Sequence, residues 1–130
     1  MATFEAYNLL VSRKNGTLPR VPFLTIKEKV LGKKYELSIS FVSEVIAQEL
    51  NATHRDKAYV PNTLSFSLSK SSGEIVMCIE SIKKEYKKFS MTYDKYLIFL
   101  LIHSMLHLKG MAHGSTMEKE EKKFLTFFTK

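Results

Sequence analysis

The chain has 130 residues, 45% of them hydrophobic and 25% charged, a composition typical of one globular domain over residues 1–130. Its 20 lysines and arginines against 13 acidic residues give a formal net charge of +7, which favours nucleic acid first and an anionic membrane second as a partner. The single cysteine excludes an internal disulfide and is consistent with a reducing cytoplasm.

Neither a secretory signal nor a membrane span is expected. Residues 1–16 lack a basic segment followed by a long apolar core. The most apolar stretch, residues 96–108, is too short to cross a bilayer and contains two histidines. The sequence therefore predicts a soluble cytoplasmic protein with no membrane partner, in which this stretch is a buried helix.

The N-terminal part of the chain predicts strands and helices in alternation. Residues 2–11 alternate loosely in polarity and predict a first strand. Residues 22–31 predict a short helix, and the alternating residues 35–43 predict a second strand.

A second helix is expected directly after that strand. Ser43 is placed to cap it, and Val45, Ile46 and Leu50 are expected on its inward face. The polar residues 51–62 predict a connection.

The C-terminal part predicts two strands, residues 63–69 and 73–79, and then three helices. These cover residues 81–89, residues 92–109 and a last segment that begins with the capping-box pair Ser115 and Glu118. A lysine stripe on the first of them is more often a solvated face than a phosphate contact. Together the elements indicate an α+β fold with one central mixed sheet of about four strands, helices around it and a central buried helix.

Three histidines are concentrated in "HSMLHLKGMAH", residues 103–113. His103 and His107 have the spacing that places two imidazoles on the same face of a helix, one turn apart. Gly110 permits the chain to reverse, so that His113 can return as a third ligand. Three nitrogen ligands leave a fourth position open, which is typical of a catalytic zinc that activates water.

Other interpretations of these histidines remain open. A helix C-terminus favours cationic side chains, so the three histidines could lie near the end of the helix without forming a shared metal site. Nickel, cobalt or copper would also suit three imidazoles. Zinc peptidases carry a glutamate directly after the first histidine, and Ser104 stands there, which disfavours peptide hydrolysis.

At these residues the chain resembles the YbeY endoribonucleases, a family also described as rRNA maturation factors. "HSMLHLKGMAH" is similar to the family signature H-G-x-L-H-L-x-G-Y-D-H. "LNATHRDKAYVPNTLSF", residues 50–66, resembles the family segment L-N-x-x-x-R followed by T-N-V-L-S-F, and "GEIVMC", residues 73–78, resembles its next strand.

The chain also departs from the family pattern. Ser104 replaces a glycine, Met111 and Ala112 replace a Tyr-Asp pair, Pro61 replaces a threonine and Thr63 a valine. None of these changes removes a candidate ligand. The lost aspartate removes a carboxylate that would orient a ligand or shape the loop.

The resemblance implies a zinc-dependent, single-strand-specific endoribonuclease that acts in 3′-end maturation of small-subunit rRNA and in ribosome quality control. It implies one Zn²⁺ per chain, held by His103, His107 and His113. It implies a catalytic and substrate-binding role for Arg55, whose guanidinium can hold a phosphate with two hydrogen bonds. The implied partners are single-stranded RNA and the small ribosomal subunit, including a ribosomal protein or an assembly GTPase.

Four further residues are candidates for the site or lie close to candidates in the sequence. Asn62 and Ser65, on the matched strand, are expected to line the substrate cleft, although Asn62 taken alone more often holds a turn. His54 is expected at the surface, and Cys78 in the core. Without the resemblance, Arg55 would be interpreted as a surface arginine on a polar loop.

Two alternative functions remain. One is a ribosome-assembly factor that binds RNA or protein and whose metal is mainly structural. The other is a metallopeptidase. Within the RNase hypothesis, the sequence does not distinguish attack by water from attack by the 2′-hydroxyl of the RNA.

Overall fold

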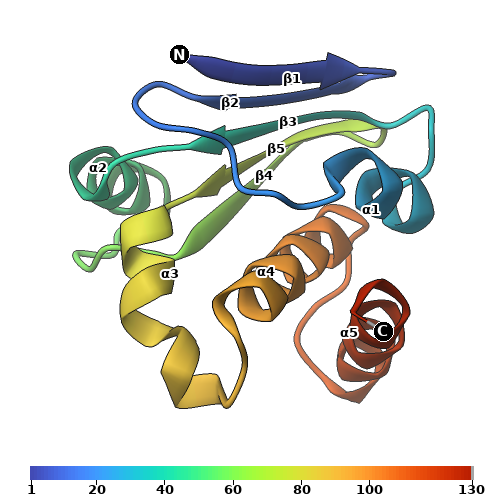
Figure 1. Cartoon of the computed structure of the whole chain (residues 1–130). Coiled ribbons are helices and arrows are strands. Elements are labelled where there is room, and N and C mark those ends of the chain that lie inside the picture. Colours follow the sequence, from blue (N-terminus) through green and yellow to red (C-terminus); the bar gives the residue numbers. More distant parts are fainter. Residues whose placement is uncertain (130) are drawn as a thin grey trace.

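The computed structural model describes residues 1–129 and shows five strands, five α-helices and one 3₁₀ helix (Figure 1). In chain order these are β1 (Ala2–Ala6), β2 (Leu9–Arg13), α1 (Phe23–Val30), β3 (Glu36–Phe41), α2 (Glu44–Arg55), β4 (Thr63–Ser69), β5 (Ser72–Met77), α3 (Ile79–Glu85), η1 (Tyr86–Phe89), α4 (Tyr93–Leu108) and α5 (Ser115–Phe128).

The strands form one mixed sheet in the order β1-β2-β3-β5-β4. The two inner pairings, β2 with β3 and β3 with β5, are parallel, and the two outer pairings are antiparallel. This confirms the predicted α+β fold with a mixed sheet.

The sheet has five strands instead of about four because residues 2–11 do not form a single strand. They form the first part of a β1–β2 hairpin, whose turn residues Tyr7 and Asn8 have φ of 42° and 66°. Two consecutive residues with positive φ match the twist of a tight hairpin. The sequence lacks the glycine that usually marks such a turn, so the break between the strands was not visible in it.

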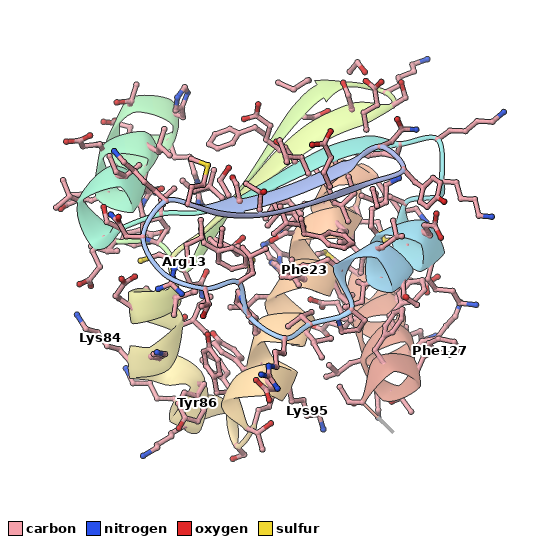
Figure 2. All side chains as sticks on the ribbon, turned by 45° about the horizontal axis from the view of Figure 1, so that its top comes forward. Arg13, Phe23, Lys84, Tyr86, Lys95 and Phe127 are labelled. Atoms are coloured by element: carbon pink, nitrogen blue, oxygen red, sulfur yellow. The ribbon has the colours of Figure 1, made fainter. Side chains whose placement is uncertain are left out.

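Helix α4 lies under one face of the sheet, with α1, α3 and α5 around it (Figure 1). Ten of its sixteen residues are buried, which confirms the expected central helix. Alternate side chains of the strands point toward it, among them Val11, Ile39 and Ile75, each 0% exposed. Phe23 of α1, labelled in Figure 2, belongs to the same core and makes an edge-on contact with Phe41 of β3.

The last turn of helix α2 contacts the opposite face of the sheet. The ring centroids of His54 on α2 and Phe66 on β4 are 5.2 Å apart, while the neighbouring Ser65 points toward α4. Because successive side chains of a strand point to opposite faces, α2 and α4 must lie on different sides.

The expected inward face of α2 is wrong. Val45 and Ile46 are 64% and 44% exposed, and the buried residues are Ala47 and Asn51. Leu50, the third residue expected there, is half-buried. The Asn51 amide donates to the Tyr59 carbonyl, so the buried face of α2 includes a polar side chain with a backbone partner and less apolar area than the pattern suggested.

The boundaries of several helices also differ from expectation. Ser43 caps α2 as predicted, since its hydroxyl accepts a hydrogen bond from the Ile46 N–H at 3.3 Å. Helix α2 then continues to Arg55, into the segment predicted as a connection. The capping box at Ser115 is not formed, because α5 begins after Gly114 without a side-chain cap.

Within residues 1–129, none of the helices has the length and apolar character needed to cross a bilayer.

Gly73 allows β5 to pass close to the end of α4, and this close approach can be tested. A Cβ at this position would lie 2.5 Å from the Tyr35 hydroxyl, 2.9 Å from Cδ2 of Leu108 and 3.1 Å from the Phe66 carbonyl oxygen. We expect Gly73→Ala to lower the free energy of unfolding by about 1–3 kcal/mol through overpacking, measured by denaturant titration. Ser38→Ala on the neighbouring strand is the control and should change it by less than about 0.5 kcal/mol. Equal stability of Gly73→Ala and the wild type would contradict this packing.

Candidate metal centre

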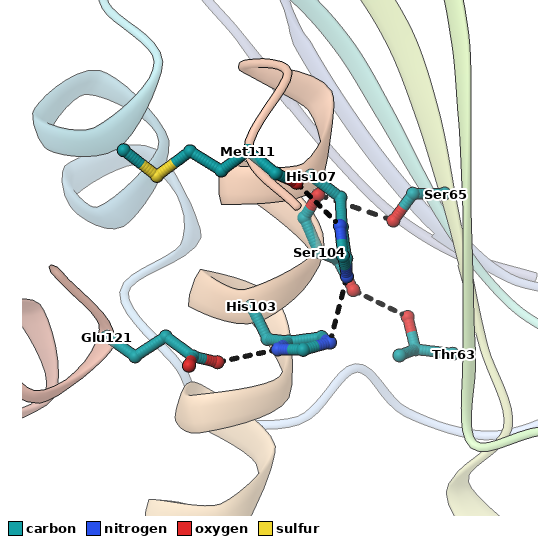
Figure 3. A network of polar contacts seen from close by, with 7 residues as sticks. All are labelled: Thr63, Ser65, His103, Ser104, His107, Met111 and Glu121. Atoms are coloured by element: carbon teal, nitrogen blue, oxygen red, sulfur yellow. Dashed lines mark hydrogen bonds and ion pairs between the residues drawn. The ribbon is translucent and has the colours of Figure 1, made fainter. Parts of the chain in front are cut away.

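Three histidine side chains converge at the C-terminal end of α4 (Figure 3 shows two of them). His103 and His107 lie one turn apart on the helix, and their Nε2 atoms are 3.1 Å apart. His113 comes from the loop that follows, and one ring nitrogen from each of the three lies within 4.8 Å of the others. The spacing argument therefore predicted the cluster correctly. Three imidazole nitrogens at this separation are a donor set that suits a divalent transition metal.

The turn after α4 brings His113 back to the helix. Gly110 has φ of +95°, which is accessible to glycine at little cost. Its N–H donates to the His107 carbonyl at 2.9 Å, and the Met111 N–H donates to the Leu106 carbonyl at 3.1 Å. This pair of bonds ends a helix and reverses the chain. The predicted role of Gly110 is thus confirmed.

Contacts on the outer side of the cluster orient two of the rings (Figure 3). Nδ1 of His103 lies 2.5 Å from a carboxylate oxygen of Glu121, and Nδ1 of His107 lies 3.0 Å from the Met111 carbonyl oxygen. When Nδ1 carries the proton and donates it to these acceptors, Nε2 keeps a free lone pair. Both free lone pairs then face the centre of the cluster, which is the arrangement that a metal ion requires.

Glu121 was not predicted from the sequence. It lies on α5 and is 8% exposed. It shares the buried face of α5 with Met117 and Phe124, so the available signal was an acidic residue at a position that the helical pattern places inside. Glu121 supplies a carboxylate to the cluster even though the aspartate of the family signature is absent.

The electrostatics favour the neutral form of the buried imidazole. Burial lowers the pKa of His107, and the imidazoles of His103 and His113 lower it further, although the Met111 carbonyl acts in the opposite direction. A neutral imidazole is the form that binds a metal ion. His107 is therefore ready to act as a ligand near neutral pH.

The cluster opens into a cavity of about 490 Å³ between α4, β4 and the end of α2. This cavity brings together all of the predicted site residues. Its lining consists of Arg55, Tyr59, Asn62, Thr63, Leu64, Ser65, Phe99, Leu100, His103, Ser104, His107 and His113.

Arg55 is the last residue of α2 and not part of a polar loop. Its side chain is exposed at the cavity, and within residues 1–129 its guanidinium has no hydrogen bond or ion pair to another side chain. A free guanidinium beside a metal-binding cluster can receive an anionic group of a ligand.

Asn62 and Ser65 line the cavity, but their polar groups bond within the protein. The Asn62 amide donates to a Glu85 carboxylate oxygen at 2.6 Å, and this oxygen also accepts from the Tyr96 hydroxyl at 3.0 Å. The Ser65 hydroxyl donates to the Ser104 carbonyl at 3.3 Å. These bonds fix the strand β4 relative to α3 and α4, which is a positioning role.

His54 and Cys78 lie outside the cavity lining. His54 packs on Phe66, as described above. Cys78 is 1% exposed in the core, and burial raises the pKa of its thiol, so it behaves as an apolar side chain.

Comparisons with known proteins show the family to which the chain is similar. The family model "Endoribonuclease YbeY" matches residues 17–127. An endoribonuclease YbeY from Alkaliphilus oremlandii is 35% identical over 107 residues, which are 71% of this chain and 71% of the relative. One from Bdellovibrio bacteriovorus is 39% identical over 83 residues, 62% of this chain and 55% of the relative.

A solved structure supports the fold. The solution structure of a protein from Thermotoga maritima matches with a TM-score of 0.60 at 23% identity, and the match covers 90% of this chain and 86% of that one. At this identity, the match supports the architecture alone.

The contact between Glu121 and His103 should strengthen metal binding. We expect Glu121→Gln to weaken the binding of a divalent cation by about 10- to 100-fold, because the loss of a partner that orients a ligand has effects of this size. Titration with Co²⁺, followed by its visible absorption, measures the affinity directly. Glu118→Gln, an exposed change on the same helix, is the matched control and should bind Co²⁺ like the wild type. If both variants bind equally well, the carboxylate does not orient His103.

Proposed function

Since the chain belongs to the YbeY endoribonuclease family, we propose that it is a zinc-dependent endoribonuclease specific for single-stranded RNA. The observation that carries the proposal is the placement of the three-histidine cluster and a free arginine in one cavity. The proposed ligands are His103, His107 and His113, with one Zn²⁺ per chain.

Zinc in this position would supply Lewis-acid chemistry and activation of water. The side chains divide the remaining tasks. Glu121 and the Met111 carbonyl accept hydrogen bonds from Nδ1 of two histidines, which fixes the rings with Nε2 directed toward the centre of the cluster. Arg55 binds the scissile phosphate and stabilises the charge that develops on its oxygens. Asn62 and Ser65 shape the wall on which the RNA lies.

The form of the cavity supports an unpaired strand as the substrate. Its volume of about 490 Å³ is in the range of sites for small ligands. A phosphate with its nucleotide can enter such a space from a flexible strand, whereas paired strands present their phosphates on a convex surface. The net charge of +7 would attract the strand over a longer distance.

We place this activity in 3′-end maturation of small-subunit rRNA and in ribosome quality control, within the cytoplasm. The proposed partners are the small subunit and, on it, a ribosomal protein or an assembly GTPase. The activity is assigned to one domain over residues 1–130.

A second candidate function is a ribosome-assembly factor whose metal is mainly structural. One observation favours it: the contacts of the cluster tie together α4, the loop after it and α5, as a structural metal site would do. RNA binding without any turnover by the zinc-loaded protein would support this alternative.

The metal site can be tested by composition and activity together. We expect about one zinc per wild-type chain by elemental mass spectrometry, and none in the folded variant His103→Ala/His107→Ala, because two of three ligands are lost. Cleavage of a single-stranded RNA should fall to background in this variant. His54→Ala, a histidine outside the cluster, is the matched control and should keep both zinc and cleavage. A folded, metal-free wild type would contradict the proposal. Separately, the end groups of the RNA products distinguish attack by water from attack by the 2′-hydroxyl.

Arg55 should affect catalysis without affecting the metal. We expect Arg55→Ala to lower kcat by about 10²–10³-fold, the usual cost of losing one donor to a developing anion. The slope of log affinity against log salt should fall by about 1, since one phosphate contact is lost. Arg20→Ala, at an exposed arginine on the loop before α1, is the control for net charge. Unchanged cleavage by Arg55→Ala would remove this residue from the mechanism, and loss of zinc would show that its role is structural.

A further inference from the structure

The loop between α2 and β4 is held rigidly although it is exposed. The Asn51 amide, on the buried face of α2, donates to the Tyr59 carbonyl at 3.0 Å. The Gln48 amide donates to the Ala58 carbonyl at 2.8 Å. Two side chains of the helix therefore hold the backbone of the loop at two consecutive residues, Ala58 and Tyr59.

The side chain of Tyr59 is exposed despite this fixed backbone. It is 55% exposed and lines the cavity together with Arg55 and His103. Because the carbonyl of Tyr59 makes the structural contact, any residue could anchor the loop, and folding does not require a large ring here. An exposed tyrosine ring that lines a cavity and extends from an anchored backbone is a binding surface with only two side-chain torsions to restrict when a ligand arrives.

The chemistry around Tyr59 indicates which part of a ligand it contacts. Arg55, at the end of α2 just before this loop, is suited to a phosphate, and the three histidines line the same cavity. A nucleotide bound by its phosphate at Arg55 presents its base next to that phosphate, where an aromatic ring is available. Stacking on such a ring accepts every base, because each base has a π face.

We propose that Tyr59 is the stacking surface for one base of the RNA strand, adjacent to the phosphate that Arg55 holds. This proposal rests on the function proposed above and adds a base-binding subsite to it. In this arrangement the loop after α2 positions the RNA strand. A phosphate of the RNA, and not a base, then faces the histidines.

The test uses a set of short single-stranded RNAs, each with one abasic position, and measures Kd for each within a time over which gel electrophoresis shows the RNA to be intact. For the wild type we expect the abasic change at one position to weaken binding about 5- to 150-fold, which corresponds to one stacked base at about 1–3 kcal/mol. Tyr59→Ala should weaken binding of the unmodified RNA by a similar factor. In this variant the abasic change at that position should have no further effect, because both changes remove the same contact.

Two control variants separate stacking from other roles. Tyr59→Phe should bind like the wild type, because it keeps the ring. Tyr7→Ala, at a 77% exposed tyrosine in the β1–β2 turn, should also bind like the wild type. The salt dependence of Tyr59→Ala should match that of the wild type, since no phosphate contact is lost.

Three results would overturn the proposal. If the abasic change raises Kd by the same factor in the wild type and in Tyr59→Ala, no base stacks on Tyr59, and the proposed RNase activity is unaffected. A loss in Tyr59→Phe as large as in Tyr59→Ala would assign the contact to the hydroxyl instead of the ring. A zinc-loaded wild type that neither binds nor cleaves single-stranded RNA would reject the proposed function and this subsite together.

Discussion

The burial of α4 against one face of the sheet is the constraint on which the site depends. Ten of the sixteen residues of this helix are buried, so neither its rotation nor its translation is free. His103 and His107 lie where the buried surface of the helix meets the cavity, and both are half-buried. The packing of the apolar side chains thus fixes the direction of two imidazoles, and a single turn at Gly110 is enough to add the third.

Local patterns predicted most of this arrangement. Strands β3, β4 and β5 follow from local patterns and α4 from its apolar stretch, and the histidine cluster follows from a helical spacing and a glycine turn. The sequence failed where tertiary contacts decide. Val45 and Ile46 look like a core face, yet α2 buries Ala47 and Asn51 instead, and Asn51 bonds to the backbone of the loop that follows. The pairing of Glu121 with His103 joins two helices, and no local rule connects them.

Two departures from the family pattern explain each other. Ser104 and Thr63 stand where the family signature has a glycine and a valine, and their hydroxyl oxygens are 2.8 Å apart. Ser104 is fully buried, so a hydroxyl there needs a partner, and Thr63 across the strand–helix interface provides one. The two changes therefore form one polar contact that fixes β4 on α4, beside the cluster and without altering a candidate ligand.

The location of Glu121 on the last helix has a consequence for local opening. Helix α5 buries three residues, against ten in α4, so it is the less costly of the two to detach. Each detachment removes the carboxylate from His103 while α4 itself stays folded. Amide hydrogen exchange in α5 would then report how long the imidazole remains oriented, and the lifetime of the docked C-terminal helix sets an upper limit on the lifetime of the ordered cluster.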